Sequence, residues 1–188
     1  MVVYIDEIII YSETWEDHVQ DIERVLSKCI PINLKSSLKK CNFGQHELIA
    51  LGHKVSGLTL DIDQKKGAAV PLKQVPKNIK EMQSFLGFAS YYRNHIRNVS
   101  HIASSLYKSC SKDVVCEITK ERRDAYDRIK HELKNAPVLL LTDFELPLKL
   151  YIDASCSQGL GGDLHRRQIV DGEPREGVIC YISRQLRC

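Results

Sequence analysis

The feature that most restricts the fold of this chain lies in its first twelve residues. Two apolar runs rich in β-branched side chains cover residues 2–5 and 8–11. Between them lie two adjacent carboxylates, Asp6 and Glu7. Val, Ile and Tyr suit a pleated, half-buried surface, and a two-residue polar break between such runs predicts a β-hairpin. We therefore expect a hairpin that presents Asp6 and Glu7 at its tip.

Carboxylates held at the tip of a hairpin suit phosphoryl-transfer chemistry. Mg²⁺ is a hard cation that prefers oxygen ligands, and metal-assisted transfer needs those ligands fixed in space. The same residues are also compatible with an ordinary hairpin that has a solvated acidic turn. The hairpin alone leaves both interpretations open.

Residues 14–30 repeat apolar side chains at three- and four-residue spacing, which predicts an amphipathic helix. Thr14 suits its N-cap, and Pro31 ends it. We interpret this helix as a scaffold that braces the hairpin. After it, the pattern favours short strands, one over Leu38–Phe43 and another over Leu48–Val55.

Two further helices are predicted, over residues 78–96 and 119–135, with Asn78 and Thr119 as their N-caps. Between them, residues 98–118 look irregular, with a short helical piece near Ile102–Tyr107, so we expect a linker there. The side chains expected in the core of the two helices are Ile79, Met82, Phe85, Leu86, Ala89, Tyr92, Ile96, Ala125, Tyr126, Ile129 and Leu133.

Strands return after residue 147. We expect them over residues 148–152 and 178–183, with a Gly-rich turn at 158–162. Asp153 closes an apolar strand, where a metal-binding carboxylate would be held rigidly. Asp163 falls in a strand, and a carboxylate that faces a core costs several kcal/mol unless it finds a partner or solvent.

Composition narrows the class of protein. The hydrophobic content of 43% and charged content of 27% are typical of soluble globular proteins. No apolar run approaches the ~20 residues that span a bilayer, and the seven cysteines form no Cys-x-x-Cys pair or zinc spacing. We expect an intracellular protein, in the cytoplasm or the nucleus, with reduced thiols and no membrane partner.

Positive charge is concentrated in the middle third of the chain. Residues 61–120 carry ten Lys and Arg against five Asp and Glu, whereas the whole chain has a net charge of only +3. Phosphate contacts with nucleic acid would explain this excess. Solvated lysines on helix surfaces explain it equally well.

Six sequence blocks add to this interpretation. They are Tyr4-Ile5-Asp6-Glu7-Ile8-Ile9-Ile10-Tyr11-Ser12, Lys40-Cys41-Asn42-Phe43-Gly44, Leu51-Gly52-His53, Ser84-Phe85-Leu86-Gly87-Phe88-Ala89-Ser90-Tyr91-Tyr92-Arg93, Ala136-Pro137-Val138-Leu139 and Tyr151-Ile152-Asp153-Ala154-Ser155. In their order and approximate spacing they resemble the Pol polyprotein of gypsy-like LTR retrotransposons, and they cover nearly the whole chain.

The resemblance implies an α+β fold with three parts. Residues 1–72 would be a reverse transcriptase palm remnant, and residues 73–112 a thumb-like helical segment. Residues 113–188 would be a connector helix and the N-terminal part of a ribonuclease H-like α/β domain. The chain would then be a fragment of a larger Pol polyprotein, whose remainder would be its partner.

The resemblance also implies the roles of individual residues. Asp6 and Glu7 occupy the polymerase carboxylate positions, with Glu7 in place of the usual aspartate, and Asp153 is similar to the first metal ligand of ribonuclease H. Asp6 and Asp153 would therefore hold Mg²⁺. The residues expected to contact an RNA/DNA template-primer or hybrid duplex are Gly52, Lys73, Lys77, Lys80, Gln83, Gly87, Arg93 and Arg97.

The parent chemistry would be RNA-directed DNA synthesis together with cleavage of RNA in hybrids. Two-metal catalysis needs several converging carboxylates, and each of the two sites has only part of its family set in this chain. We therefore expect the 188-residue chain to be inactive by itself. The alternatives are a non-enzymatic nucleic-acid-binding remnant and a functionless relic.

Overall fold

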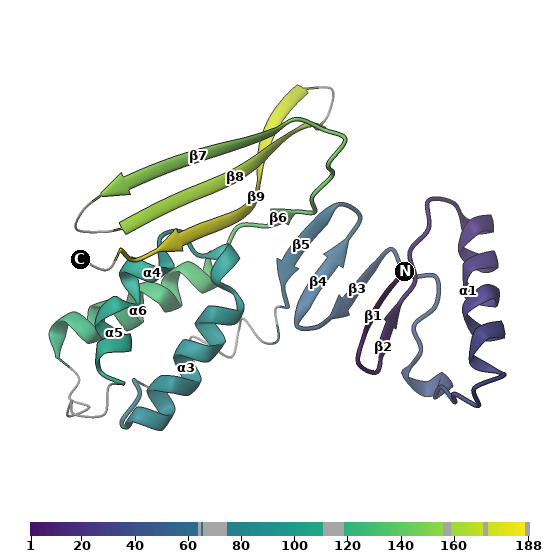
Figure 1. Ribbon diagram of the computed structural model, residues 1–188, viewed down its shortest axis with the longest axis horizontal. Coiled ribbons are helices and arrows are strands. Elements are labelled where there is room, and N and C mark those ends of the chain that lie inside the picture. Colours follow the sequence, from purple (N-terminus) through teal and green to yellow (C-terminus); the bar gives the residue numbers. More distant parts are fainter. Residues whose placement is uncertain (64, 66–74, 111–118, 156–158, 171–172, 187–188) are drawn as a thin grey trace. The chain divides into compact units, whose positions relative to one another are not determined.

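The computed structural model describes residues 1–63, 65, 75–110, 119–155, 159–170 and 173–186 (Figure 1). The chain divides into two compact units, Met1–Gln45 and His46–Cys188. Both contain helices and strands, which confirms the mixed α+β class. The predicted domain boundaries near residues 72 and 112 lie outside the described residues and stay predictions.

The Met1–Gln45 unit consists of a hairpin, a helix and one 3₁₀ turn. Strands β1 (Val2–Tyr4) and β2 (Glu7–Ile9) pair antiparallel, and helix α1 spans Trp15–Cys29. The hydroxyl of its N-cap Thr14 accepts a hydrogen bond from the backbone N–H of Asp17 at 3.1 Å. The predicted hairpin and helix are thus confirmed.

The strand predicted over Leu38–Phe43 is wrong. Residues Leu38–Lys40 form a 3₁₀ helix, η1, in which the backbone N–H of Cys41 donates to the carbonyl of Leu38 at 3.2 Å. A strand needs a neighbour for its backbone groups, and among the described residues this segment has none.

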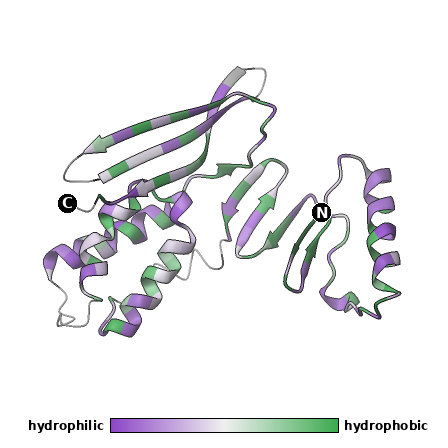
Figure 2. Cartoon of the chain, in the orientation of Figure 1, coloured by the Kyte–Doolittle hydropathy of each residue, from purple (hydrophilic) through white to green (hydrophobic). Residues whose placement is uncertain are grey.

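None of the described residues 1–45 is buried. Even the apolar side chains of α1 lie largely open, with Trp15 62%, Val19 47% and Leu26 47% exposed. Hydrophobic residues are interspersed with hydrophilic ones along α1 in Figure 2. The unit therefore has local hydrogen bonds and turns but no core of its own.

The His46–Cys188 unit begins with a small antiparallel sheet in the order β3-β4-β5-β6. Its strands are β3 (Glu47–Ala50), β4 (His53–Ser56), β5 (Thr59–Ile62) and β6 (Leu139–Leu140). The predicted continuous strand over Leu48–Val55 is wrong. Leu51 and Gly52 have φ of 50° and 77° and form a two-residue turn, because both lie in the left-handed region that two-residue hairpin loops use.

The same unit contains four α-helices and a 3₁₀ helix between β5 and β6 in the described part of the chain, the last α-helix just before β6. They are α3 (Ile79–Tyr91), η2 (Arg93–His95), α4 (Val99–Ile102), α5 (Ser104–Lys108) and α6 (Lys120–Lys134). Asn78 and Thr119 cap α3 and α6 through side-chain oxygens that accept backbone N–H groups, as predicted. Helix α3 ends at Tyr91, earlier than the predicted end at residue 96, and the 3₁₀ helix η2 follows it.

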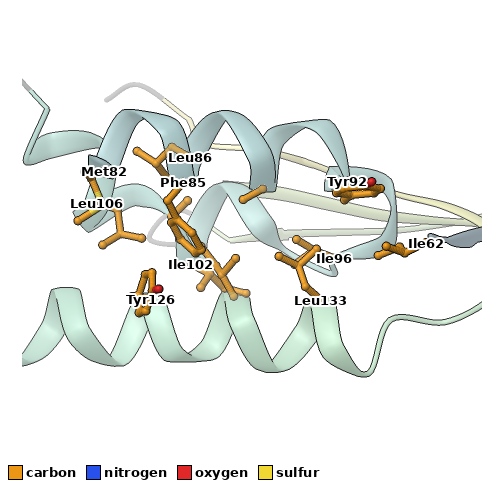
Figure 3. Packing of buried hydrophobic residues seen from close by; sticks show 13 residues of the cluster. Ile62, Met82, Phe85, Leu86, Tyr92, Ile96, Ile102, Leu106, Tyr126 and Leu133 are labelled. Atoms are coloured by element: carbon orange, nitrogen blue, oxygen red, sulfur yellow. The ribbon is translucent and has the colours of Figure 1, made fainter. Parts of the chain in front are cut away.

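The core of this unit joins α3, α4, α5 and α6 (Figure 3). The buried side chains that form it are Ile62, Met82, Phe85, Leu86, Ala89, Tyr92, Ile96, Ile102, Ala103, Leu106, Tyr126, Ile129 and Leu133. The linker predicted over residues 98–118 is therefore wrong for residues 99–108, whereas the short helical piece predicted near residues 102–107 is confirmed by α5. Ile102 and Leu106 fix α4 and α5 in the core, whereas 111–118 lie outside the described residues.

A second antiparallel sheet has the order β7-β8-β9, formed by β7 (Leu148–Ser155), β8 (Gly159–Val170) and β9 (Glu173–Arg184). Hydrophobic and hydrophilic residues alternate along β7 (Figure 2). Gly159 to Gly162 begin β8, so the predicted Gly-rich turn is wrong over these residues. None of the helices in the described ranges is long and apolar enough to cross a bilayer.

Candidate functional site

The hairpin that carries Asp6 differs by one residue from its predicted form. Tyr4 pairs with Glu7, so the two-residue loop is Ile5–Asp6 and Glu7 is the first residue of β2. Both carboxylates are exposed. The prediction that both lie in the turn is therefore wrong for Glu7, because the polar pair and the backbone turn do not coincide.

Ile5 has φ of 53°, a conformation that costs an L-residue roughly 1–2 kcal/mol, and its side chain is 85% exposed. The substitution Ile5→Gly is therefore expected to stabilise the hairpin by about 1 kcal/mol, seen as slower amide hydrogen exchange in β1 and β2. Val3→Gly is the matched control in strand β1, and it should accelerate exchange. Faster exchange in Ile5→Gly would contradict this account of the loop.

The turn between β3 and β4 is held by Tyr91, the last residue of α3, and by Tyr92, its C-cap. The Tyr92 hydroxyl donates to the carbonyl of Gly52 at 2.8 Å, and the Tyr91 hydroxyl donates to the carbonyl of Leu51. Gly52 is itself buried, and its positive φ is a local reason for glycine at this position. Whether it also approaches a nucleic-acid backbone stays a prediction.

Two histidines lie against the same tyrosines. The rings of His53 and His95 stack with centroids 5.7 Å apart, and His53 also lies 5.2 Å from the Tyr92 ring. The Nδ1 of His95 lies 3.2 Å from the carbonyl of Pro137, which can only accept, so this nitrogen carries the proton. Burial lowers the pKa of His95 below its ordinary value, against the opposing effect of that hydrogen bond.

The predicted nucleic-acid contacts on α3 share one exposed face. Lys80, Gln83 and Gly87 are exposed and follow the i, i+3, i+7 spacing that places residues along one side of a helix. A Cβ added at Gly87 would meet no atom within 4 Å, so the helix surface there is open. Lys77 is exposed just before the helix.

The remaining predicted contacts lie elsewhere. Arg93 is exposed in η2, and Arg97 follows it with 66% of its side chain exposed. Lys73 lies outside the described residues. The structure therefore joins three of the predicted contacts in one stripe on α3 and places Arg97 at a second surface.

That second surface is the face of the β7-β8-β9 sheet that bears Asp153. Asp153 is exposed on β7, paired with Gly161 of β8. A cleft of about 120 Å³ runs past it. The residues that line the cleft are Arg97, Asn98, His101, Tyr151, Ile152, Asp153, Ser155, Gly159, Leu160, Gly161, Gly162, Asp163 and Ser183.

Asp163 has found the partner that its position in a strand requires. Its carboxylate lies 2.8 Å from the Arg97 guanidinium, and only 13% of its side chain is exposed. Sequence reasoning missed this ion pair because 66 positions separate the two residues. The one available signal was the position of Asp163 in an apolar strand, because a carboxylate there needs a cation as partner.

Asp6, Glu7 and Asp153 are suitable in kind for Mg²⁺, which prefers carboxylate oxygens and often takes only one or two from the protein. Asp163 lies on the same face of the sheet as Asp153 but is already paired with Arg97. Within the described part of the chain, no three His, Cys, Asp or Glu side chains come together as a metal site.

Comparisons with known proteins give these features a context. Residues 118–188 match the family described as the RNase H-like domain found in reverse transcriptase. The chain is 34% identical over 98% of its length to the retrovirus-related Pol polyprotein from transposon gypsy of Drosophila melanogaster, and equally to that from transposon 297. The chain is related to the Pol polyproteins of gypsy-like retrotransposons.

Another relative is the transposon Tf2-3 polyprotein of Schizosaccharomyces pombe, which is 33% identical over 82% of the chain. In every case the similarity covers a small part of the relative. The chain spans 18% of the gypsy Pol polyprotein and 17% of the 297 Pol polyprotein. It is thus similar to one segment of a Pol polyprotein.

Solved structures agree with this assignment. The foamy viral protease-reverse transcriptase in complex with RNA/DNA hybrid superposes with a TM-score of 0.79 at 25% identity, over 97% of this chain and 24% of that one. The same viral protein in complex with dsDNA gives a TM-score of 0.78 at 25% identity, over 99% of this chain and 38% of that one. The predicted resemblance to a reverse transcriptase–ribonuclease H region is thereby confirmed.

Proposed function

We propose that this chain is the Pol segment that runs from the end of the reverse transcriptase palm through the thumb into a ribonuclease H-like domain, and that it holds an RNA/DNA duplex. The observation that carries the proposal is the stripe of Lys80, Gln83 and Gly87 on the exposed face of α3. A cation, an amide and a bare backbone suit close approach to a sugar-phosphate backbone. The foamy viral relatives bound to RNA/DNA hybrid and dsDNA support the same ligand class.

In this proposal the carboxylates have separate roles. Asp6 would hold Mg²⁺ beside the primer 3′-hydroxyl, and Asp153 would hold Mg²⁺ beside the RNA strand of a hybrid. Bound Mg²⁺ supplies positive charge that orients phosphate oxygens and neutralises them. The rest of a Pol polyprotein would supply the other parts of both sites.

Binding of a fluorescently labelled RNA/DNA hybrid, titrated at several NaCl concentrations, tests the proposal. The logarithm of the affinity is expected to fall linearly with the logarithm of salt concentration, because bound phosphates release counterions. Lys80→Ala should make that slope shallower by about one, whereas Lys134→Ala, an exposed lysine at the end of α6, should not. Absence of binding, or binding independent of salt, would contradict the proposal.

A second candidate is duplex binding without catalysis. The Arg97–Asp163 ion pair favours this candidate. Asp163 lies on the same face of the sheet as Asp153 and could have been a second metal ligand there, but its carboxylate is already paired with Arg97. Under both candidates the 188-residue chain by itself should neither extend a primer nor cleave a hybrid in Mg²⁺. Nucleotide incorporation on a primed RNA template would overturn this expectation.

A further inference from the structure

Strand β7 forms an outer edge of the β7-β8-β9 sheet (Figure 1). In the described part of the chain it pairs with β8 alone, over eight consecutive residue pairs without a register shift. An edge strand turns half of its backbone N–H and C=O groups away from the sheet, where another strand can pair with them. The free edge of β7 is thus a surface that a further strand can extend.

The opposite edge of the sheet is protected in ways that β7 is not. Native edges are blunted by short strands, bulges, proline or a covering element. Strand β9 has a register shift relative to β8 beside Leu164, and its Ser183 carbonyl accepts a hydrogen bond from the Ser100 hydroxyl of α4 at 2.8 Å. Strand β7 is eight residues long, regular and without proline. Of the two edges, β7 is therefore the one open to another chain.

Large apolar side chains of β7 are exposed on both faces of the sheet. Ile152 is 70% exposed and Leu150 54%, and these two lie on one face because side chains alternate along a strand. Tyr151, on the other face, is 49% exposed. Exposed apolar side chains gathered on one short strand indicate a surface that another polypeptide covers.

The two charges of β7 indicate which polypeptide this is. Lys149 and Asp153 are its only charged residues, and they lie on the same face. Two copies of β7 that pair antiparallel around Tyr151 bring Lys149 of each copy opposite Asp153 of the other, and Leu150 opposite Ile152. Side chains directly opposite each other interact, so both ends of this pairing attract. A pairing centred on Lys149 or on Asp153 would instead oppose like charges.

We propose that β7 is the contact surface of a homodimer, in which two copies of this chain pair antiparallel around Tyr151 and join their sheets into one of six strands. The surface is isologous, since each copy supplies the same strand and the same two charges. Lys149 already donates to Glu176 of its own chain, but an ammonium has three N–H donors and can bond to both carboxylates. This pairing needs no nucleic acid, so its test is independent of the proposed function.

Sedimentation equilibrium of the 188-residue chain over a range of concentrations measures the association. The wild type is expected to form a two-chain species. Asp153→Lys places lysines opposite each other at both ends of the pairing and should weaken the association roughly 10-fold, and Lys149→Glu should do the same with carboxylates. Lys54→Glu is the matched control and should change it less than twofold. Lys54 also has a carboxylate partner, Glu47 at 2.8 Å, but it lies on β4, an inner strand.

A mixture of Asp153→Lys and Lys149→Glu tests the register. In the mixed pair each introduced charge faces an opposite charge on the other chain, and the remaining Asp153 faces the remaining Lys149. The mixture should therefore associate about as tightly as the wild type, although neither variant does so alone. A mixture no tighter than its components would overturn the pairing around Tyr151.

Tyr151→Cys gives a readout that needs no change of charge. At the centre of the pairing, position 151 faces itself, so mild oxidation should link two chains through a disulfide more than it links wild-type chains. Leu58→Cys, at a 60% exposed position in the turn between β4 and β5, should not exceed the wild type. Equal linking in the two variants would overturn the inference. A wild type that stays monomeric at about 1 mM would also overturn it, and would leave the edge to a strand of another polypeptide.

Discussion

Replacement of Phe85 by alanine is expected to lower the free energy of unfolding of the His46–Cys188 unit by about 3–5 kcal/mol. The Phe85 side chain is only 3% exposed, and its ring centroid lies 4.4 Å from that of Tyr126. The contact joins α3 to α6 near the centre of the core (Figure 3). Its removal costs the transfer free energy of the ring and leaves a cavity between two helices.

Urea denaturation followed by circular dichroism measures this loss. Phe144→Ala is the matched control, because the Phe144 side chain is 84% exposed and the same substitution there should change the free energy of unfolding by less than about 0.5 kcal/mol. A loss below about 1 kcal/mol in Phe85→Ala would mean that α3 and α6 do not share a tightly packed core.

Stability is expected to fall on acidification because of His95. Burial lowers the pKa of His95 in the folded chain, whereas its unfolded value is about 6.5. Its Nε2 is buried and has no hydrogen-bond partner among the described residues, so a proton added there gains no acceptor. Between pH 6.5 and the lower folded pKa, the unfolded state therefore binds a proton that the folded state does not.

The groups around His95 set the size of this effect. His53 opposes its protonation and Asp61 favours it, while the Pro137 carbonyl accepts from the other ring nitrogen. The contribution of His95 to stability is fully present above pH 6.5 and is lost as pH falls through this window, by at most about 1.4 kcal/mol per pH unit. Urea denaturation at a series of pH values measures the slope.

His95→Gln should flatten the dependence of stability on pH below 6.5 relative to the wild type. The control is His131→Gln, which removes a histidine from the exposed face of α6 without touching the His53–His95 stack. If the wild type and His95→Gln lose stability in parallel on acidification, another group causes the loss.

The three long helices α1, α3 and α6 were the most predictable part of the fold, because each carries its own start signal. Thr14, Asn78 and Thr119 cap their helices as the sequence indicates, and the apolar periodicity correctly placed Phe85, Tyr126 and Ile129 in the core. Caps and periodicity act within a few residues, so a single sequence contains them. The existence and approximate limits of these helices could therefore be predicted from the sequence.

Strands and connections were harder, because long-range pairing determines them. Leu38–Phe43 has a strand-like pattern but no neighbouring strand, whereas Gly159–Gly162 has a turn-like composition but pairs on both sides. Residues 99–108 were expected to link two domains, yet Ile102 and Leu106 find a core between α3 and α6. In each case a distant segment overrides the local preference.

The candidate sites show the same division. The local context indicated a hairpin at Asp6 and a strand near Asp153, although the turn holds Ile5 and Asp6 instead of Asp6 and Glu7. Their roles as metal ligands stay predictions. The ion pair between Arg97 and Asp163, and the cleft that it helps to form, could not be predicted, because the two residues meet only when the sheet folds back onto the helices.

The lack of any buried side chain in the described Met1–Gln45 unit has a consequence for the order of folding. Apolar burial is the main term that offsets the conformational entropy lost on folding, and a segment whose apolar side chains are at most partly buried has low local stability. The His46–Cys188 unit, with its shared helical core, can become a cooperative folding unit first. The carboxylate of Asp6 then reaches a fixed geometry only when another apolar surface covers the hairpin, so we expect the hairpin to become ordered last.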